Sequence, residues 1–179
     1  MMKYLLILSL LVSVHALAQL RLPTNETGQV QYQEIVRVPN AKLPARQLMG
    51  QLHDWAEFYY ESEPTAEQQY DPEHNIQFIK ASYAIDDQIV RYTLTVEAKF
   101  GRYRATITDL IAESKGISVP VRTTSSTASE LERAADGKIT NRKLIEQAAQ
   151  QQADLYRQID KSCRDTLASL KQFLTTLQK

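Results

Sequence analysis

The sequence has few of the residues from which catalytic and phosphate-binding loops are built. Its 179 residues include five glycines, three histidines and one cysteine. No Gly-x-Ser-x-Gly elbow, phosphate-binding loop or dinucleotide-binding motif occurs in it, and five glycines are few for such loops. We therefore predict no catalytic residue and no cofactor. Enzymatic activity stays open, with a non-enzymatic role favoured.

Long apolar runs are also scarce, and the one that exists lies at the N-terminus. Lys3 gives a positive start, residues 4–14 are almost all apolar, and small residues stand at Ala16 and Ala18. This order is typical of a secretory signal peptide, which we predict is cleaved after Ala18. The alternative is an apolar strand or helix of the fold. The run is too short to span a membrane, so we expect an exported chain without a transmembrane segment, in the periplasm, at the cell surface or secreted.

The chain has no excess of charge of either sign. Residues 1–18 contain one lysine and no acid, so the 21 basic residues fall to 20 after cleavage, against 21 acidic ones. Nucleic-acid binding normally needs a clustered positive field, and an exported chain does not meet nucleic acid in the cell. We therefore expect no nucleic-acid partner.

Cysteine and histidine are too few for a disulfide or a recognisable metal site. Ile159, Cys163, Leu167 and Leu170 recur at helical spacing, which predicts that the thiol is a buried core residue rather than a reactive group. The two histidines after residue 18, His53 and His74, are not at ligand spacing. We predict no metal site.

Periodicity predicts a strand over residues 30–38, a helix over 44–60 and a surface loop over 61–75. Three strands follow at 76–85, 89–98 and 102–110, with turns so short that they form an antiparallel meander. The first strand alternates imperfectly, because Glu34 falls on its apolar side and Ile35 on its polar side.

The rest of the chain is predicted as a linker and a long helix. Residues 114–127 have no periodicity, a short helix is expected over 129–135 ending at Gly137, and Thr140 is the expected N-cap of the last helix. About 37 residues at 1.5 Å each make roughly 55 Å, so this helix either breaks or projects and pairs with something. Its expected apolar face is Leu144, Ala148, Leu155, Ile159, Cys163, Leu167, Leu170, Leu174 and Leu177.

The domain organisation predicted from these segments is a signal peptide at 1–18, a sheet domain at 19–113, a linker with a short helix at 114–138 and the long helix at 139–179. The fold class is α+β: an antiparallel sheet with the order strand, helix, strand, strand, strand, followed by the long C-terminal helix.

Several short patterns resemble domain-of-unknown-function family 4468, exported proteins of Bacteroidota. They are Leu22-Pro23, the strand at 32–38, the helix with Trp55, the run Tyr92-Thr93-Leu94-Thr95-Val96 and the turn Gly101-Arg102-Tyr103-Arg104. The resemblance covers about residues 22–112 and implies a fold similar to the TATA-binding protein. It implies no activity. This chain departs from the family in its third element, which has no glycine at 76–82.

One group of polar residues is a candidate ligand-binding site. Thr93, Thr95 and Glu97 on one predicted strand and Arg102 and Arg104 on the next share the face opposite the apolar residues. Arginine presents a planar fork for carboxylate or phosphate. The competing interpretation is a solvated sheet face with cross-strand Glu97–Arg pairs.

Two functions remain open at this point. The first is a non-enzymatic periplasmic or surface module that binds a partner protein or envelope component, or associates with itself, through the C-terminal helix. The second is a small polar-ligand carrier or enzyme that uses the Arg/Thr/Glu face of the sheet.

Overall fold

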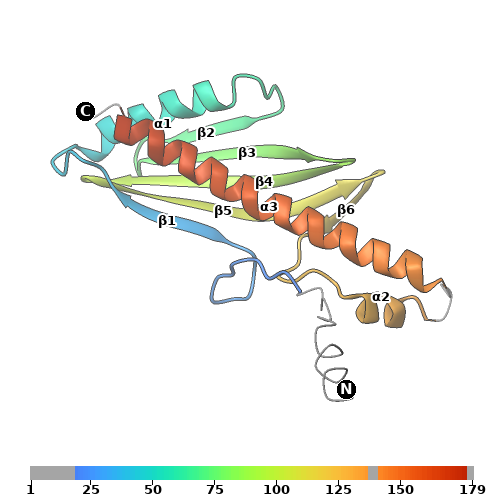
Figure 1. Ribbon diagram of the computed structural model, residues 1–179. Coiled ribbons are helices and arrows are strands. Elements are labelled where there is room, and N and C mark those ends of the chain that lie inside the picture. Colours follow the sequence, from blue (N-terminus) through green and yellow to red (C-terminus); the bar gives the residue numbers. More distant parts are fainter. Residues whose placement is uncertain (1–18, 137–140, 177–179) are drawn as a thin grey trace, which may run out of the picture.

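Six antiparallel strands form a single sheet, and two long helices cover one of its faces (Figure 1). The structure is a computed structural model that describes residues 19–136 and 141–176. The elements are β1 (Tyr32–Arg37), α1 (Ala45–Tyr59), β2 (Glu67–Asp71), β3 (Ile76–Ile85), β4 (Gln88–Lys99), β5 (Arg102–Ser114), β6 (Ile117–Pro120), α2 (Ala128–Ala134) and α3 (Arg142–Thr176).

The strands stand in the order β1-β5-β4-β3-β2, and β6 also pairs with β5 beyond the end of β1. The predicted α+β class, with an antiparallel sheet and a long last helix, is confirmed. The meander follows from its turns. Asp86, with φ of 52°, and Gly101, with φ of 65°, adopt the left-handed backbone that tight hairpin turns need.

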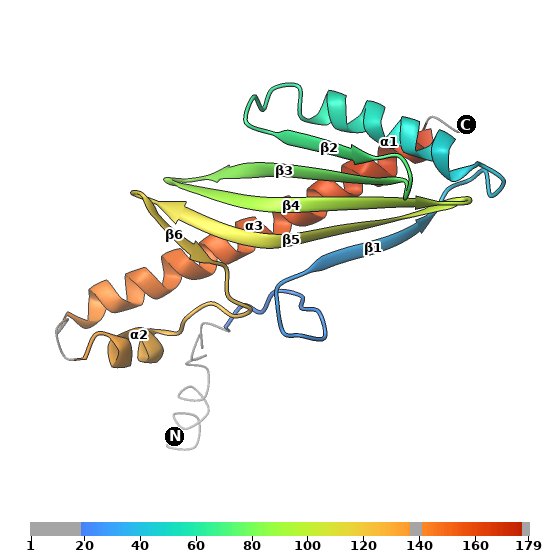
Figure 2. The same ribbon diagram turned by 180° about the vertical axis from the view of Figure 1, so that it is seen from behind.

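The two faces of the sheet differ because side chains alternate along each strand. In β4 the residues Val90, Tyr92, Leu94, Val96 and Ala98 are buried, and those between them are not. We call the buried side the covered face, since α1 and α3 lie on it. We call the other side the open face, and Figure 2 shows no described helix in front of it.

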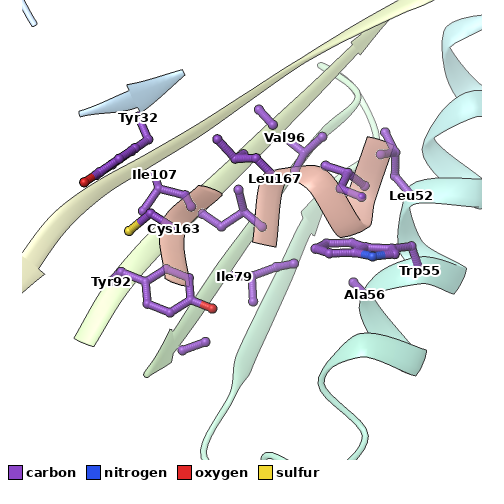
Figure 3. Close-up of a cluster of buried hydrophobic side chains, with 14 of the residues drawn as sticks. Tyr32, Leu52, Trp55, Ala56, Ile79, Tyr92, Val96, Ile107, Cys163 and Leu167 are labelled. Carbon is purple, nitrogen blue, oxygen red and sulfur yellow. The ribbon is translucent and has the colours of Figure 1, made fainter. Parts of the chain in front are cut away.

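The core lies between the covered face and the two helices. Cys163 and Leu167 of α3 lie among Ile79, Tyr92 and Ile107 of the strands, with Leu52 and Trp55 of α1 beside them (Figure 3). The prediction that Cys163 is a core residue is confirmed, because its exposure is 0%.

Buried hydroxyl groups join the helices to the sheet. Tyr60 at the end of α1 and Tyr92 of β4 bond to each other at 2.9 Å, and Tyr83 of β3 bonds to Thr166 of α3 at 2.8 Å. Among the described residues, the hydroxyl of Tyr103 is a buried side-chain oxygen without a partner. The Tyr60–Tyr92 and Tyr83–Thr166 bonds fix the orientation of α1 and α3 on the sheet, because hydrogen bonds have a preferred direction.

The last helix does not break. From Leu155 to Leu174 its apolar side chains pack on the sheet, and its first three turns extend past the strands and lie beside α2 (Figure 1). The part of the helix that extends past the sheet therefore packs against α2 of the same chain. Among the described residues, no helix is both long and apolar enough to cross a membrane.

The buried face of that first part differs from the prediction. Leu144 is 55% exposed and Ala148 is also exposed, whereas Ile145 and Ala149 are buried. The expected face was wrong by one residue here, because α2 rather than the sheet sets which side is covered. From Leu155 onward the predicted and observed faces agree.

Two segments predicted to be irregular contain strands. The loop over 61–75 includes β2, and the linker over 114–127 includes β6, while β5 continues past residue 110 to Ser114. Both strands lie at sheet edges, and nearly all of their side chains are exposed. Strand β2 has no apolar alternation, and β6 has only four residues, with Ile117 and Val119 exposed, so periodicity does not reveal them. The left-handed turn at Lys115 and Gly116 returns the chain from β5 to β6.

The remaining expectations are met closely or lie outside the described residues. Helix α1 is within one residue of its predicted bounds at each end, and α2 has a Thr127–Glu130 capping box. The signal peptide at 1–18, the helix end at Gly137, the Thr140 cap and Leu177 all lie outside the described ranges.

Candidate functional site

All five predicted site residues lie on the open face of two neighbouring strands. In the β4–β5 register, Glu97 stands opposite Arg104, and Thr95 and Thr93 stand opposite Thr106 and Thr108. Their side chains are exposed or half-buried, whereas Tyr103 and Leu94 between them are buried. The predicted common face is therefore present.

A row of three cations crosses one end of the open face. Arg37 of β1 stands directly opposite Arg102 of β5, and Arg102 stands directly opposite Lys99 of β4. We call these three residues the basic row. Like charges placed directly opposite each other on one face are destabilising. The fold therefore holds three cations together at an electrostatic cost.

Glu97 is the carboxylate nearest to this row. Its oxygens accept from Lys99 Nζ at 2.9 Å and from the Arg104 guanidinium in the next register position. The hydrogen bond from Lys99, with the charge of Arg104, holds the pKa of the Glu97 carboxyl below its ordinary value. Glu97 thus stays ionised at neutral pH and offsets one charge of the four nearby cations, which are Arg37, Lys99, Arg102 and Arg104.

The turn between β4 and β5 sets the position of the basic row. Gly101 donates its N–H to the Leu43 oxygen at 2.9 Å, and its own oxygen accepts from the Val38 N–H at 3.1 Å. A Cβ at Gly101 would collide with the Ala41 carbonyl oxygen. This turn therefore needs glycine, and its bonds tie the end of β1 to the turn that carries Lys99 and Arg102.

Two separate hollows lie on the open face, and they divide the predicted residues. The first, of about 140 Å³, is lined by Ile35, Glu97, Lys99, Arg102, Tyr103 and Arg104. The second, of about 540 Å³, lies farther along the strands and includes Thr93, Lys80, Arg91 and Asp109. Thr95 lines neither hollow. The sequence thus identified one face correctly, and the structure shows two distinct places on it.

Sequence reasoning missed Lys99, which falls in the turn between the strands predicted at 89–98 and 102–110, and did not place Arg37 among the five candidate site residues. The signal was available in the alternation, because Lys99 follows Glu97 by two residues and therefore has the same orientation. The pairing of Arg37 with Arg102 was not available, since it depends on the register between β1 and β5.

The histidines and the cysteine do not form a site in the described part of the chain. His53 of α1 contacts Glu57 at 3.4 Å and Gln77 of β3 at 3.4 Å, and His74 bonds to Asp71 at 2.8 Å. No group of three metal-binding side chains occurs among the described residues. Burial raises the pKa of the Cys163 thiol to about 12, which suits a core residue and not a nucleophile.

Comparison with known proteins supports the fold. No protein-family model matches the sequence, and no curated protein matches it. A TBP-like protein from Parabacteroides distasonis is similar with a TM-score of 0.50 and 14% identity, over 83% of this chain and 96% of that one. A DUF4468 family protein from Bacteroides ovatus is similar with a TM-score of 0.52 and 12% identity, over 83% and 90%.

The resemblance predicted from the sequence is thus confirmed by a structural neighbour from family 4468. At identities of 14% and 12%, these likenesses show the fold alone. Folds host unrelated functions, so these likenesses carry no function over to this chain.

Proposed function

We propose that this protein is an exported, non-enzymatic binding module whose basic row binds an anionic group of a partner protein or envelope component. The observation that carries the proposal is the basic row itself. Arg37, Arg102 and Lys99 stand side by side on a bare sheet face, without a carboxylate among them in the row. An anion bound over Arg102 would relieve the repulsion between these cations.

The size of the adjoining hollow supports a partner larger than the group that it inserts. A pocket for a whole small ligand usually has a volume of about 300–1,000 Å³. The hollow of about 140 Å³ beside the basic row fits one carboxylate or phosphate group. We therefore expect that the anionic group belongs to a larger molecule that lies across the open face.

We place the partner contact on the sheet rather than on the C-terminal helix. The apolar stripe of α3, which first suggested pairing, is covered within the chain from Ile145 to Leu174 by α2, α1 and the strands. The open face has no such cover among the described elements (Figure 2).

Export and the lack of catalysis are parts of the proposal that rest on other residues. Export rests on the signal-peptide pattern at 1–18. The non-enzymatic role rests on the absence of catalytic motifs from the sequence. The buried state of Cys163 agrees with it, because a protonated and enclosed thiol is a poor nucleophile.

A second candidate function is supported by the second hollow. Its volume of about 540 Å³ is in the range of small-molecule sites, and Thr93, Ser82 and Arg91 offer polar groups at its wall. A carrier for a small polar ligand would use this end of the open face instead.

Titration with anionic polymers tests the first function against the second. We would measure binding of polyglutamate and of polyphosphate by calorimetry at low ionic strength, because salt screens exposed charges. Arg102→Gln should weaken binding about tenfold, which is roughly 1.4 kcal/mol. Arg91→Gln is the matched control, since Arg91 lies on the same face but already pairs with Glu113 at 2.8 Å.

The control variant should bind as the wild-type protein does. Failure of the wild-type protein to bind either polymer would contradict the proposal. A greater loss from Arg91→Gln than from Arg102→Gln would favour the second hollow and the small-ligand function.

A further inference from the structure

The free edge of β1 carries an apolar side chain that the fold does not use. Ile35 is 63% exposed and lies on the open face, where its neighbours along the strand are the polar residues Gln33 and Arg37. It is the residue that breaks the alternation of this strand in the sequence. An isolated exposed isoleucine is ordinary, but this one stands at a sheet edge.

Two hydrogen bonds near the ends of β1 show to which side its backbone N–H and C=O groups point. The Val38 N–H donates toward β5, to the Gly101 oxygen, and the Gln31 N–H donates away from β5, to the Pro23 oxygen. Backbone groups alternate in direction along a strand. The N–H and C=O groups of Gln33, Ile35 and Arg37 therefore point away from β5.

Within the described part of the chain, those three residues form a short segment of unpaired edge. Before it, the chain around Pro23 occupies the edge at Gln31. After it, Pro39 ends the strand and has no N–H. Along the segment itself, Figure 1 shows no other strand of the described chain. The segment has no proline, lysine or bulge, which protect many edges from pairing, and its one outward-facing charged residue, Arg37, stands at its end.

We propose that a second copy of this chain pairs with this edge, antiparallel, about a two-fold axis at Ile35. Gln33 of each copy would then stand opposite Arg37 of the other, and Ile35 opposite Ile35. All three outward-facing residues would exchange both backbone hydrogen bonds. The two isoleucine side chains would cover each other on the open face.

This register is selected by the residues around it. An axis at Glu34 would place two carboxylates opposite each other, and an axis at Arg37 would place two guanidiniums together. An axis at Val36 would set Gln33 against Pro39, which cannot donate. An axis at Gln33 would set Ile35 against Gln31, whose N–H is already bonded to Pro23. The free segment is symmetric about Ile35 and about no neighbouring residue.

The consequence is one continuous sheet across two copies, with both open faces on the same side. A two-fold axis normal to the sheet keeps α1 and α3 of both copies on the opposite side. This inference does not depend on the proposed anion binding. It uses only the backbone of β1 and the side chains at 33–37.

Sedimentation velocity over a concentration series tests the pairing, with the chain that begins at Gln19. We expect a mass that approaches two chains as the concentration rises. Ile35→Lys should weaken association at least about tenfold. Ile35→Pro should do the same, because it removes an outward N–H and no bond to β5. Ile89→Lys is the matched control, since Ile89 lies on the open face of β4, away from the edge, and is 47% exposed.

Cysteine cross-linking tests the register. In a hydrogen-bonded antiparallel pair the two Cα atoms are about 5.5 Å apart, within the range of a disulfide. Under mild oxidation, Ile35→Cys should give a covalent dimer, whereas Ile89→Cys should not. The single native cysteine, Cys163, is buried and does not interfere.

Three results would overturn the proposal. The first is a single-chain mass for the wild-type protein at its highest soluble concentration. The second is a dimer that Ile35→Lys leaves intact while circular dichroism shows a folded protein. The third is cross-linking of Ile35→Cys no greater than that of Ile89→Cys, which would assign any dimer to another surface.

Discussion

The covered and open faces of the sheet are made by the same strands, but their side chains have different surroundings. On the covered face, β4 places Leu94 with 0% exposure against the core. On the open face, its neighbours Thr93 and Thr95 are half-buried, and Glu97 is in ion pairs with exposed cations. The core that holds the fold together lies on the covered face. The open face has the cations of the basic row, and it adjoins the free edge of β1. The comparison teaches that a shift of one residue along a strand separates the side chains that stabilise the core from those that stay accessible on the open face.

The largest expected difference in the free energy of unfolding is between substitutions at two adjacent residues of β4, one on each face. Leu94→Ala should lower the free energy of unfolding by about 2–5 kcal/mol, because it opens a cavity in the core. Thr95→Ala, one residue away on the open face, should change it by less than about 0.5 kcal/mol. Urea denaturation measures both. Equal losses would show that a further element covers the open face.

A smaller effect on the free energy of unfolding is expected at alkaline pH, and it comes from the buried Cys163 thiol on the covered face. Burial holds the Cys163 pKa at about 12, whereas an unfolded cysteine ionises near pH 8.5. The unfolded state therefore binds fewer protons above that pH, and stability falls as the pH rises from about 8.5 toward 12.

Cys163→Ala should remove about 1–2 kcal/mol of this loss between about pH 8 and pH 10. Urea denaturation at the two pH values measures it, with each protein compared with itself to cancel the cavity of the variant. Buried tyrosines titrate later and contribute in the same direction, so pH 10 is the upper limit. An unchanged loss in the variant would mean that the thiol ionises in the folded protein.

The smallest effect is expected on the open face and has the opposite sign. Arg102→Gln should raise the free energy of unfolding by about 0.2–1 kcal/mol, because it removes the repulsion from Arg37 and Lys99. Low-salt urea denaturation measures it. A loss of stability from this variant would show that Arg102 has a structural partner and would weaken the case that the row is kept for binding.

Much of the fold was predictable from local pattern. The bounds of β3 match the prediction at both ends, and α1 and β4 differ from it by one residue. These segments have one apolar face and strong alternation or helical spacing. Strand β2 was missed because its exposed side chains follow no pattern, and β6 because it has only four residues. Pairing with β3 and β5 makes them strands.

The sequence predicted which face of the sheet carries the candidate site residues, but not where on that face they lie. Alternation put Thr93, Thr95, Glu97, Arg102 and Arg104 on one side, and the structure agrees. Their division between two hollows depends on register and on the bulge between Arg91 and Thr93. That information is not present in either strand alone.

By itself, the sequence determined that the long strands have one buried face, that Cys163 is a core residue, and that a long helix follows the sheet. Each of these depends on spacing within one segment, which short-range geometry fixes. Only the tertiary structure decided that Arg37, Arg102 and Lys99 form one row, that the helix end packs on α2, and that the edge at Ile35 is free. Each of these depends on contacts between distant segments, and such contacts exist only after the chain has closed its core.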